Sequence, residues 1–387
     1  MKKTEDHITN TNRRDCRVGG KFSASLLLAT VLLTLAAPVS AEPPRVGSKH
    51  DVDVMTVNLY VGGDISGVMT LDPTDPNYGE ELVGAVTGIY SEIVASAPSV
   101  RLQTVANQIV RRMPDIVAVE EASLIRVQSP GDLMVGGSTP ATNVVYDFLK
   151  LLVADLKARG AHYQIVATAN EIDVELPMMN LQTGGIDDVR LNDREAILVR
   201  TDLPSGQLRA SHPQSGNFVN VIPIPALSLF VERGWCAVDV SVRGRNFRCI
   251  CTHLEEETAP QIQALQVQEL LAGPAKTLAP VIILGDFNAD PLHRDGSYAY
   301  DLMPAAGFGD AWAKLHPQTP ASGLTWGHDE YLADPSTLFD RRIDFVFYRG
   351  KGAVPVQAEV INLTTGRAQP PLWASDHAAV GVGFLLK

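Results

Sequence analysis

The sequence predicts an α/β protein in which two mixed β-sheets pack face to face and helices cover the outer face of each sheet. About nine short segments have the apolar or alternating pattern of strands, and about four longer ones have helical periodicity. Some strands follow one another through tight turns and others through helices, which predicts both antiparallel and parallel neighbours. Two stacked sheets accommodate this mixture.

The predicted strands are short runs rich in Val, Ile, Phe and Tyr. In residues 281–286, VIILGD, four apolar residues are typical of a strand covered on both faces, and Gly285 breaks the pattern. Strands are expected at residues 52–58, 115–121, 162–168, 195–200, 235–242, 247–254, 281–286, 342–348 and 378–384.

The clearest predicted helix covers residues 101–112. Its apolar residues recur at the i, i+3, i+4, i+7 spacing of one buried face: Leu102, Val105, Ala106, Ile109, Val110 and Met113. Helices are also expected at residues 144–158, at 259–273 and near 82–96.

The strands at 235–242 and 247–254 are joined by Arg243-Gly244-Arg245, which indicates a hairpin. Cys236 would then lie diagonally across from Cys251. An exported protein could pair Cys236 with Cys249 or Cys251, although diagonal neighbours are often too far apart to bridge. The chain has no CxxC spacing, so a zinc site is not favoured.

The first 41 residues have the pattern of a secretory signal. Six Lys or Arg precede a short apolar stretch that ends in Val39-Ser40-Ala41, which predicts cleavage after Ala41 and a secreted or periplasmic protein. The alternative is an uncleaved anchor, but the stretch is short for a membrane span. The whole chain is 45% hydrophobic, which is typical of a globular protein. Residues 42–387 show no repeat or linker and are expected to form a single catalytic domain.

The charge of the mature chain argues against a protein that grips nucleic acid tightly. Removing residues 1–41 takes away six Lys/Arg and three Asp/Glu, which leaves 26 basic and 41 acidic residues and a formal charge of −15. Proteins that bind long nucleic acids through their phosphates usually carry the opposite balance. A hydrolase that contacts one phosphate through a metal is not excluded.

Polar residues gather at the ends of the predicted strands, where rigid strands often carry functional side chains. Asp344 is the hardest to explain structurally, because a carboxylate between Ile343 and Phe345 needs a partner. The set consists of Asn58, Glu120, Glu121, His253, Asp286, Asn288, Asp344, Asp376 and His377. Carboxylates, amides and two imidazoles, with no soft ligand, suit Mg²⁺ or Mn²⁺. Metal-assisted attack of water on phosphorus uses the same kinds of group.

The segments MTVNLY, DIVAVEE, REAILVR, THL, GDFNADP, RIDFVF and SDHAAV occur in the order of the endonuclease/exonuclease/phosphatase superfamily, which the chain resembles over about residues 50–387. That group includes DNase I, abasic-site endonucleases, neutral sphingomyelinases and inositol polyphosphate 5-phosphatases. The resemblance implies a four-layer α/β/β/α sandwich and a metal-dependent phosphoesterase.

The resemblance also implies roles for individual residues. Asn58, Glu121 and Asp376 would belong to the metal site, with Glu121 as the main ligand, although Glu120 stands where the family has Gln. Asp286 would activate water and Asn288 would hold it or a phosphate oxygen. His253 and His377 would face the phosphate, and Asp344 would orient His377 and raise its pKa. Which imidazole is the acid stays open.

Three further segments bear on the substrate. Residues 60–93 are expected to form an added loop and helix beside the site, and residues 171–196 an irregular stretch. Arg194 in that stretch would contact a phosphate or form a surface salt bridge. Leu229, Phe230 and Trp235 would form an apolar rim that meets lipid, or would be packing.

The function expected from these features is secreted, nuclease-like hydrolysis of a phosphodiester. The alternatives are a sphingomyelinase- or phospholipase C-like hydrolase that makes transient contact with a membrane surface, a phosphomonoesterase of the same fold, and a binding protein with a decayed site. The last predicts that a site residue be missing, and none is.

Overall fold

The structure, a computed structural model, describes residues 50–294 and 296–387, and these lie in one compact unit. The predicted signal segment, residues 1–41, and its cleavage site lie outside the described residues. Within the described ranges, no helix combines the length and the apolar character that crossing a bilayer requires.

The first sheet has eight strands. Its order is β15-β16-β1-β2-β6-β3-β4, with β5 paired to β6 beside this path. Strands β1 and β2 run parallel, and all other neighbours in this sheet run antiparallel. The strands are β1 Val52–Asn58, β2 Ile116–Glu120, β3 Leu124–Gln128, β4 Asn143–Asp147, β5 Tyr163–Met179, β6 Ile186–Arg200, β15 Ala353–Ile361 and β16 Ala379–Leu386.

The second sheet has six strands in the order β13-β14-β12-β11-β10-β7. Here β11 and β12 are the parallel pair. Its strands are β7 Leu208–Asn217, β10 Gly234–Val242, β11 Arg245–His253, β12 Val281–Asp286, β13 Gly309–Asp310 and β14 Asp344–Arg349. A separate two-stranded ribbon pairs β8, Ile222–Ile224, with β9, Leu229–Val231.

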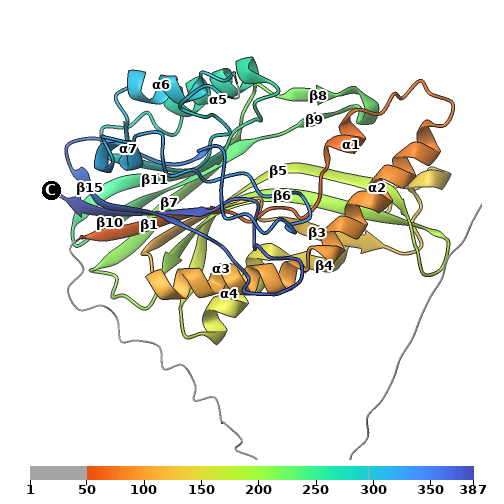
Figure 1. Cartoon of the computed structure of the whole chain (residues 1–387), viewed down its shortest axis with the longest axis horizontal. Helices are drawn as coiled ribbons and strands as arrows, with labels where there is room; N and C mark the ends of the chain where they lie inside the picture. The colour runs from red at the N-terminus through yellow and green to blue at the C-terminus, as the bar shows by residue number, and fades with distance from the viewer. Residues whose placement is uncertain (1–49, 295) are drawn as a thin grey trace, which may run out of the picture. The chain divides into compact units, whose positions relative to one another are not determined.

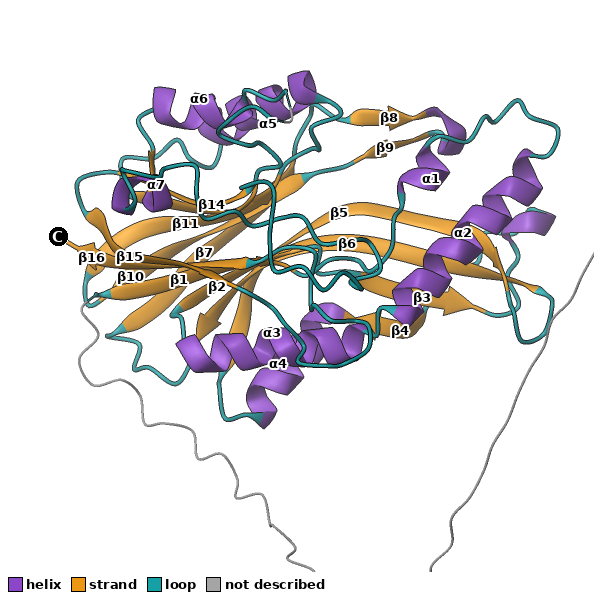
Figure 2. Ribbon diagram, in the orientation of Figure 1, coloured by secondary structure: helices purple, strands orange, loops and turns teal. Residues whose placement is uncertain are grey.

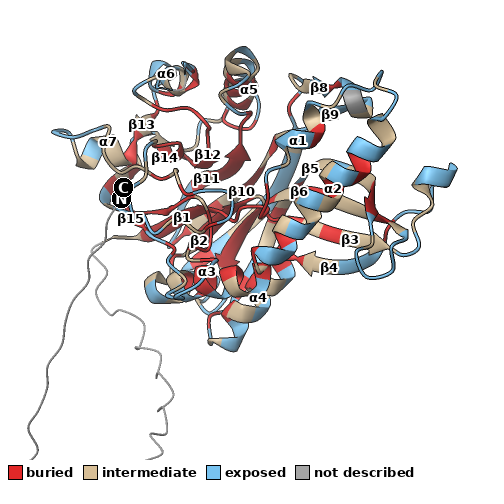
Figure 3. Cartoon of the chain, turned by 45° about the vertical axis from the view of Figure 1, so that its right-hand side comes forward, coloured by how far each residue is buried: buried red, intermediate tan, exposed pale blue. Residues whose placement is uncertain are grey.

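The sheets and helices form the predicted α/β/β/α layers (Figures 1 and 2). A core between the sheets contains side chains of both, including Val54 and Ile116 from one and Cys249 and Leu284 from the other. Figure 3 shows these central strands buried, while the outer helices keep exposed faces. The helices are α1 Ser66–Met69, α2 Tyr78–Ala95, α3 Pro98–Arg112, α4 Phe148–Ala158, α5 Pro260–Ala272, α6 Ala299–Ala305 and α7 Ala311–Leu315, with 3-10 turns η1 Leu133–Val135 and η2 Pro225–Leu227.

Helices α3 and α4 cover the first sheet, and α5 and α6 cover the second. The stripe predicted for residues 101–112 is the face that α3 buries, and Pro98 opens this helix at a position where no N–H is needed. The helix expected at residues 144–158 begins only at Phe148, because the Asp147 side chain accepts from the Lys150 N–H and caps it. Residues 143–147 before it form β4.

Residues 171–196 were expected to be irregular, and the structure corrects this. Strand β5 continues to Met179 and β6 begins at Ile186, so most of the stretch is a long antiparallel ribbon. The alternation of Ile172, Val174 and Leu176 with polar residues is the sequence signal that indicates this strand.

The hairpin predicted between β10 and β11 is confirmed, with Arg243 and Gly244 both at positive φ in its turn. Cys236 lies directly opposite Cys251 rather than diagonally. Both cysteines, and Cys249, are buried and free, so the structure contains none of the disulfides considered among them.

Gly285 allows β11 and β12 to approach closely where they end. Its φ is +150°, and a Cβ there would lie 1.9 Å from the Thr252 carbonyl oxygen. A side chain at this position would push the two strands apart. The glycine therefore keeps His253 and Asp286, which are paired in register, next to each other.

Candidate active site

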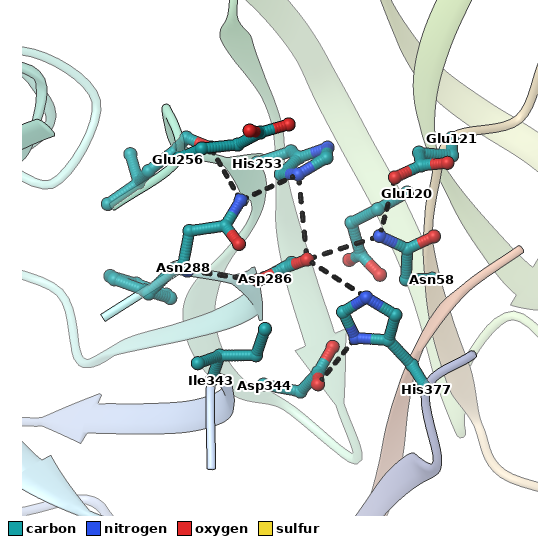
Figure 4. A network of polar contacts seen from close by, with 12 residues as sticks. Asn58, Glu120, Glu121, His253, Glu256, Asp286, Asn288, Ile343, Asp344 and His377 are labelled. Carbon is teal, nitrogen blue, oxygen red and sulfur yellow. Dashed lines mark hydrogen bonds and ion pairs between the residues drawn. The ribbon is translucent and has the colours of Figure 1, made fainter. Parts of the chain in front are cut away.

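The ends of strands from both sheets meet at one place. In the first sheet Asn58 pairs in register with Glu120, at the carboxyl ends of the parallel strands β1 and β2. In the second sheet Asp286 is paired with His253 on one side and with Asp344 on the other. His377 precedes β16, which runs antiparallel to β1, so it reaches the same edge. Figure 4 shows these side chains pointing toward one another.

The amide of Asn58 connects the two sheets. Its Nδ2 donates to Glu121 Oε1 at 3.0 Å and to Asp286 Oδ2 at 3.1 Å, and its Oδ1 accepts from the Tyr60 N–H at 2.8 Å. Since the amide oxygen is engaged by the backbone, Asn58 in this arrangement presents donors that hold the two acids together (Figure 4).

The structure separates the roles of the two neighbouring glutamates. Glu120 points between the sheets, where it accepts from Thr56 Oγ1 at 2.7 Å, and burial raises its pKa to about 8. Glu121 has a positive φ of 51°, which turns it toward a cavity that it helps to line. Its Oε2 accepts from the Val61 N–H at 2.7 Å. The predicted preference for Glu121 over Glu120 as the site carboxylate agrees with this geometry.

His377 and Asp344 form a buried pair. The Nδ1 of His377 lies 2.9 Å from Asp344 Oδ2, and its Nε2 lies 3.6 Å from Asp286 Oδ2. Burial alone would lower the pKa of His377, but the charges of Asp344, Asp376 and Asp286 outweigh it and raise that pKa well above its usual value. These acids therefore favour the protonated form of His377.

His253 has the opposite electrostatic character. Arg233 Nη1 lies 3.0 Å from its Nδ1, and Asn288 Nδ2 lies 3.2 Å from its Nε2, which is also 3.5 Å from Asp286 Oδ2. Burial first, and then the charges of Arg233 and His377, lower the pKa of His253 well below its usual value. The surroundings thus favour the protonated form of His377 and the neutral form of His253.

Asn288 and Asp376 complete the group of predicted residues that the structure brings together. Asn288 donates from Nδ2 to the Leu254 carbonyl at 3.1 Å, and its N–H donates to Asp286 Oδ1 at 2.9 Å. Asp376 accepts from Trp326 Nε1 at 3.2 Å, and burial raises its pKa to about 6.

A cavity of about 530 Å³ opens onto these residues. Its polar end is lined by Glu121, His253, Asp286, Asn288, Asp376 and His377. A concave site with convergent polar groups and shifted pKa values is the usual place for chemistry in a protein.

Arg194 is not brought to this cavity. Its guanidinium donates to the Ala122 carbonyl at 2.8 Å and to Asp147 Oδ1 at 2.8 Å, and it is largely buried. The contact predicted between Arg194 and a phosphate is not supported, because its donors tie β6 to the start of α4.

Sequence reasoning missed two features beside the site. Arg233, in the segment ERGW just before β10, lines the cavity and approaches Glu171, Glu255 and Glu256 at 3.7 to 3.9 Å. Burial opposes its charge, but these carboxylates more than compensate and raise its pKa above the usual value. Glu195 was visible in REAILVR and given no role.

Glu171 and Glu195 form a buried carboxyl pair behind His253, and the three residues each offer an atom within 4.8 Å of the others. Burial, followed by the charge of Glu171, raises the pKa of Glu195 well above its usual value. Glu195 therefore keeps its proton to a higher pH in the folded state than in the unfolded chain.

This pair predicts a pH-dependent stability. Because the folded state binds more protons, its stability is full below the unfolded pKa of Glu195 and decreases as pH rises toward the folded pKa. Glu195→Gln keeps a donor for Glu171 and cannot ionise. We expect its melting temperature to match the parent's at pH 5 and to exceed it by about 2 °C or more at pH 9. Parallel pH profiles for the parent, Glu195→Gln and the exposed-site control Glu80→Gln would contradict this assignment.

The donor set at the polar end fits a hard divalent cation. The lining offers carboxylate oxygens, an amide and imidazoles, and no cysteine lines the cavity among the described residues. Burial, and then the charge of Glu121, raises the pKa of Asp193 to about 7, and burial, and then Asp344, raises the pKa of Asp286 to about 7. Acids crowded in this way are stabilised by a bound cation, and Glu121 and Asp376 both line this end of the cavity.

The structure was compared with those of known proteins. One similar structure is an endonuclease/exonuclease/phosphatase family protein from Leptotrichia buccalis, with 13% identity over 86% of this chain and 99% of that one, at a TM-score of 0.52. A Beutenbergia cavernae endonuclease/exonuclease/phosphatase has 18% identity over 87% and 72% of the two chains at 0.48. The mannosyl-6-phosphatase Bt3783 of Bacteroides thetaiotaomicron has 16% identity over 87% and 100% at 0.47.

No curated protein matches the sequence. The sequence model of the endonuclease/exonuclease/phosphatase family, in contrast, matches residues 55–377, from within β1 to His377 itself. The match includes every strand end that contributes to the site, and the resemblance predicted from the motifs is confirmed. This chain belongs to the endonuclease/exonuclease/phosphatase family.

Proposed function

We propose that this chain is an exported, divalent-metal-dependent phosphodiesterase. The observation that carries the proposal is the convergence of Asp286 with a neutral imidazole and a charged one, 3.5 and 3.6 Å from the same carboxylate oxygen. Export is proposed from the signal-like residues 1–41.

The side chains provide a proton acceptor and a proton donor that both line the polar end of the cavity. Burial, and then Asp344, raises the pKa of Asp286 to about 7, which suits a base that takes a proton from water near neutral pH. His377 carries a proton that it can give to the leaving oxygen, while Asp344 fixes its orientation. His253, whose pKa is lowered by burial, would face a phosphate oxygen without changing its own charge.

Glu121, with Asp376 lining the same end of the cavity, would hold the cation. When bound, Mg²⁺ or Mn²⁺ supplies a Lewis acid for a phosphate oxygen and increases the acidity of water. The hydrogen bonds from Asn58 and the Val61 N–H fix the Glu121 carboxylate for this task.

The cavity mouth disfavours a long nucleic acid, although a nuclease-like substrate was the first expectation. Exposed acids at the cavity are Asp64, Glu232, Glu256, Asp329 and Glu330. The two arginines that line it within the described ranges, Arg233 and Arg341, already have carboxylate partners. A polyanion meets repulsion at such a mouth, so the proposal favours a phosphodiester with a single negative charge.

Metal removal tests the proposal. We expect hydrolysis of bis(p-nitrophenyl) phosphate with Mg²⁺ or Mn²⁺, complete loss with EDTA and recovery on adding metal back. Glu121→Gln should raise the metal concentration for half-maximal activity at least about tenfold, because it weakens the main charged ligand. The measurement is initial rate against metal concentration.

The matched control is Glu232→Gln, an exposed acid at the same cavity, which should leave the metal dependence unchanged. Activity that persists in EDTA, or an unchanged metal requirement in Glu121→Gln, would count against the metal assignment. A panel of plasmid DNA, RNA, sphingomyelin, phosphatidylcholine and inositol phosphates then separates nuclease, lipid-hydrolase and monoesterase activities.

A further inference from the structure

The cavity has a second, apolar end, which we call the apolar chamber and which is formed by α1, α2, the outer parts of β5 and β6, and the β8–β9 ribbon. In Figure 1 these elements lie together at the right-hand side, away from the stacked centre of the two sheets. We propose that the apolar chamber binds an apolar group attached to the phosphate, so that the substrate is a phosphodiester with one hydrophobic substituent. This inference rests on the proposed function and names the substrate class for that site.

Helix α2 presents a continuous apolar stripe to the apolar chamber. Val86, Ile89, Tyr90 and Ile93 all line it and recur at the i, i+3, i+4, i+7 spacing of one helical face. Glu80 and Glu81 lie in the exposed first turn instead. The helix therefore directs its apolar side toward the cavity.

A second wall comes from the β5–β6 ribbon, which packs against α2. Val174 lies across from Leu191, and Leu176 lies across from Val189, in adjacent cross-strand pairs on one face. All four side chains line the cavity, and all are half-buried rather than fully buried. Residues that serve the core alone are packed on every side, whereas these keep a free side toward the cavity.

The apolar chamber and the catalytic residues are parts of one cavity. Tyr60 and Val61 line it, and the Val61 N–H donates to Glu121 Oε2 at 2.7 Å. This hydrogen bond therefore joins an apolar residue of the cavity wall directly to a residue of the candidate active site. A phosphate placed at His253 and His377 would direct one ester substituent along the apolar wall.

The size and chemistry of the cavity select this occupant. Close-packed interiors leave few voids larger than a water molecule, and about 530 Å³ lies in the usual range for small-molecule sites. An apolar wall left to water is unfavourable, so an occupant with apolar surface is stabilised there. The acids at the mouth exclude a polyanion, and a diester carries one charge.

A chain-length series tests the proposal. The substrates are methyl, butyl and octyl p-nitrophenyl phosphate, which share one leaving group, assayed with Mg²⁺ below their aggregation concentrations. Each buried methylene contributes at most about fourfold, from roughly 0.8 kcal/mol. We expect kcat/KM to rise at least about 100-fold from methyl to octyl in the parent enzyme.

Two variants remove the gain without touching the catalytic residues. Val174→Trp fills the apolar chamber, and Ile89→Glu places a charge in it. Both should bring the octyl value down to that of the methyl ester and leave the methyl value within about threefold of the parent's. Their controls are Val144→Trp on β4 and Val94→Glu on α2, which make comparable changes at exposed positions outside the cavity.

The outcomes separate the two proposals. A flat chain-length profile with an active methyl ester overturns the apolar chamber and leaves the phosphodiesterase standing, whereas inactivity on all three esters overturns the phosphodiesterase itself. A gain that appears only above the aggregation concentration also overturns the apolar chamber, since it reports adsorption to a surface. Hydrolysis of phosphatidylcholine in vesicles, lost in Val174→Trp, identifies a bilayer lipid as the source, and hydrolysis of monomeric esters alone identifies a soluble one; both support the apolar chamber.

Discussion

Asp286→Asn should lower kcat for bis(p-nitrophenyl) phosphate by about 10³-fold or more while the protein stays folded. The substitution keeps the shape of the side chain and removes the group that accepts the proton of water. Asp286 is almost fully buried among Asn58, His253 and His377. Burial and the charge of Asp344 raise its pKa to about 7, which means that its ionised form is destabilised in the folded protein. The neutral side chain of the Asn variant does not have this cost. The melting temperature without metal should therefore equal or exceed that of the parent.

The control is Asp301→Asn, the same chemical change at an exposed position on α6, which should leave kcat and the melting temperature unchanged. The measurements are steady-state kinetics with saturating metal and thermal unfolding in EDTA. If Asp286→Asn hydrolyses the diester at the parent's rate, Asp286 is not the base.

Asp344→Asn should lower kcat by about 10²- to 10⁴-fold, although Asp344 is not placed to touch the substrate. The Oδ2 of Asp344 lies 2.9 Å from His377 Nδ1 and holds the ring so that Nε2 faces Asp286. An amide at this position can favour the wrong tautomer, which is costly where a carboxylate orients a catalytic histidine. Asp344 is therefore a positioning residue for His377.

A pH profile distinguishes this role from a structural one. Asp344 is the first of the three acids that raise the pKa of His377, so the variant's imidazole should lose its proton at a lower pH. If catalysis requires the protonated ring, activity is lost as pH rises through that pKa, and Asp344→Asn should shift this limb of the kcat profile to lower pH. In a His377→Ala background, Asp344→Asn should cause little further loss. An unchanged high-pH limb of the kcat profile would falsify the pairing of Asp344 with His377. So would a double variant whose loss in kcat equals the product of the losses in the two single variants.

Much of the sandwich could be predicted because its central strands are buried on both faces. The expected limits of β1 and β12, residues 52–58 and 281–286, are those observed. The periodicity of residues 101–112 predicted α3 for the same reason: one neighbour, the first sheet, decides which face is apolar. Edge strands such as β4, β7 and β15 were missed, because their half-exposed sequences mix polar and apolar residues.

The strand-end residues of the site were visible in the sequence because strand ends are identifiable and their polar residues are unusual there. Arg233 could not be recognised in this way, because a charged residue before a strand is common. Its place in the site is seen only in the structure, where it lies 3.0 Å from His253. Arg194 is the opposite case, because the sequence suggested a site residue that the structure does not bring to the cavity. It follows an acidic stretch of the chain, but its hydrogen bonds to Ala122 and Asp147 hold it elsewhere. The apolar chamber could not be predicted, because it needs the register of Val174 with Leu191.

The site residues come from two separate β-sheets, which are joined at the site by the Asn58–Asp286 and His377–Asp344 contacts. Asn58 lies at the end of β1, and Glu121 and His377 lie next to the ends of β2 and β16 in the first sheet, whereas His253, Asp286 and Asp344 belong to the second. Across the divide, the spacing of these groups is set by how the interior side chains of the sandwich interlock. A misplacement of about 1 Å can cost a reaction roughly 100-fold. The rate of the reaction should therefore depend on how the two β-sheets are aligned. Removing a methyl group from the core between the sheets can slow the reaction even though that group does not contact the substrate.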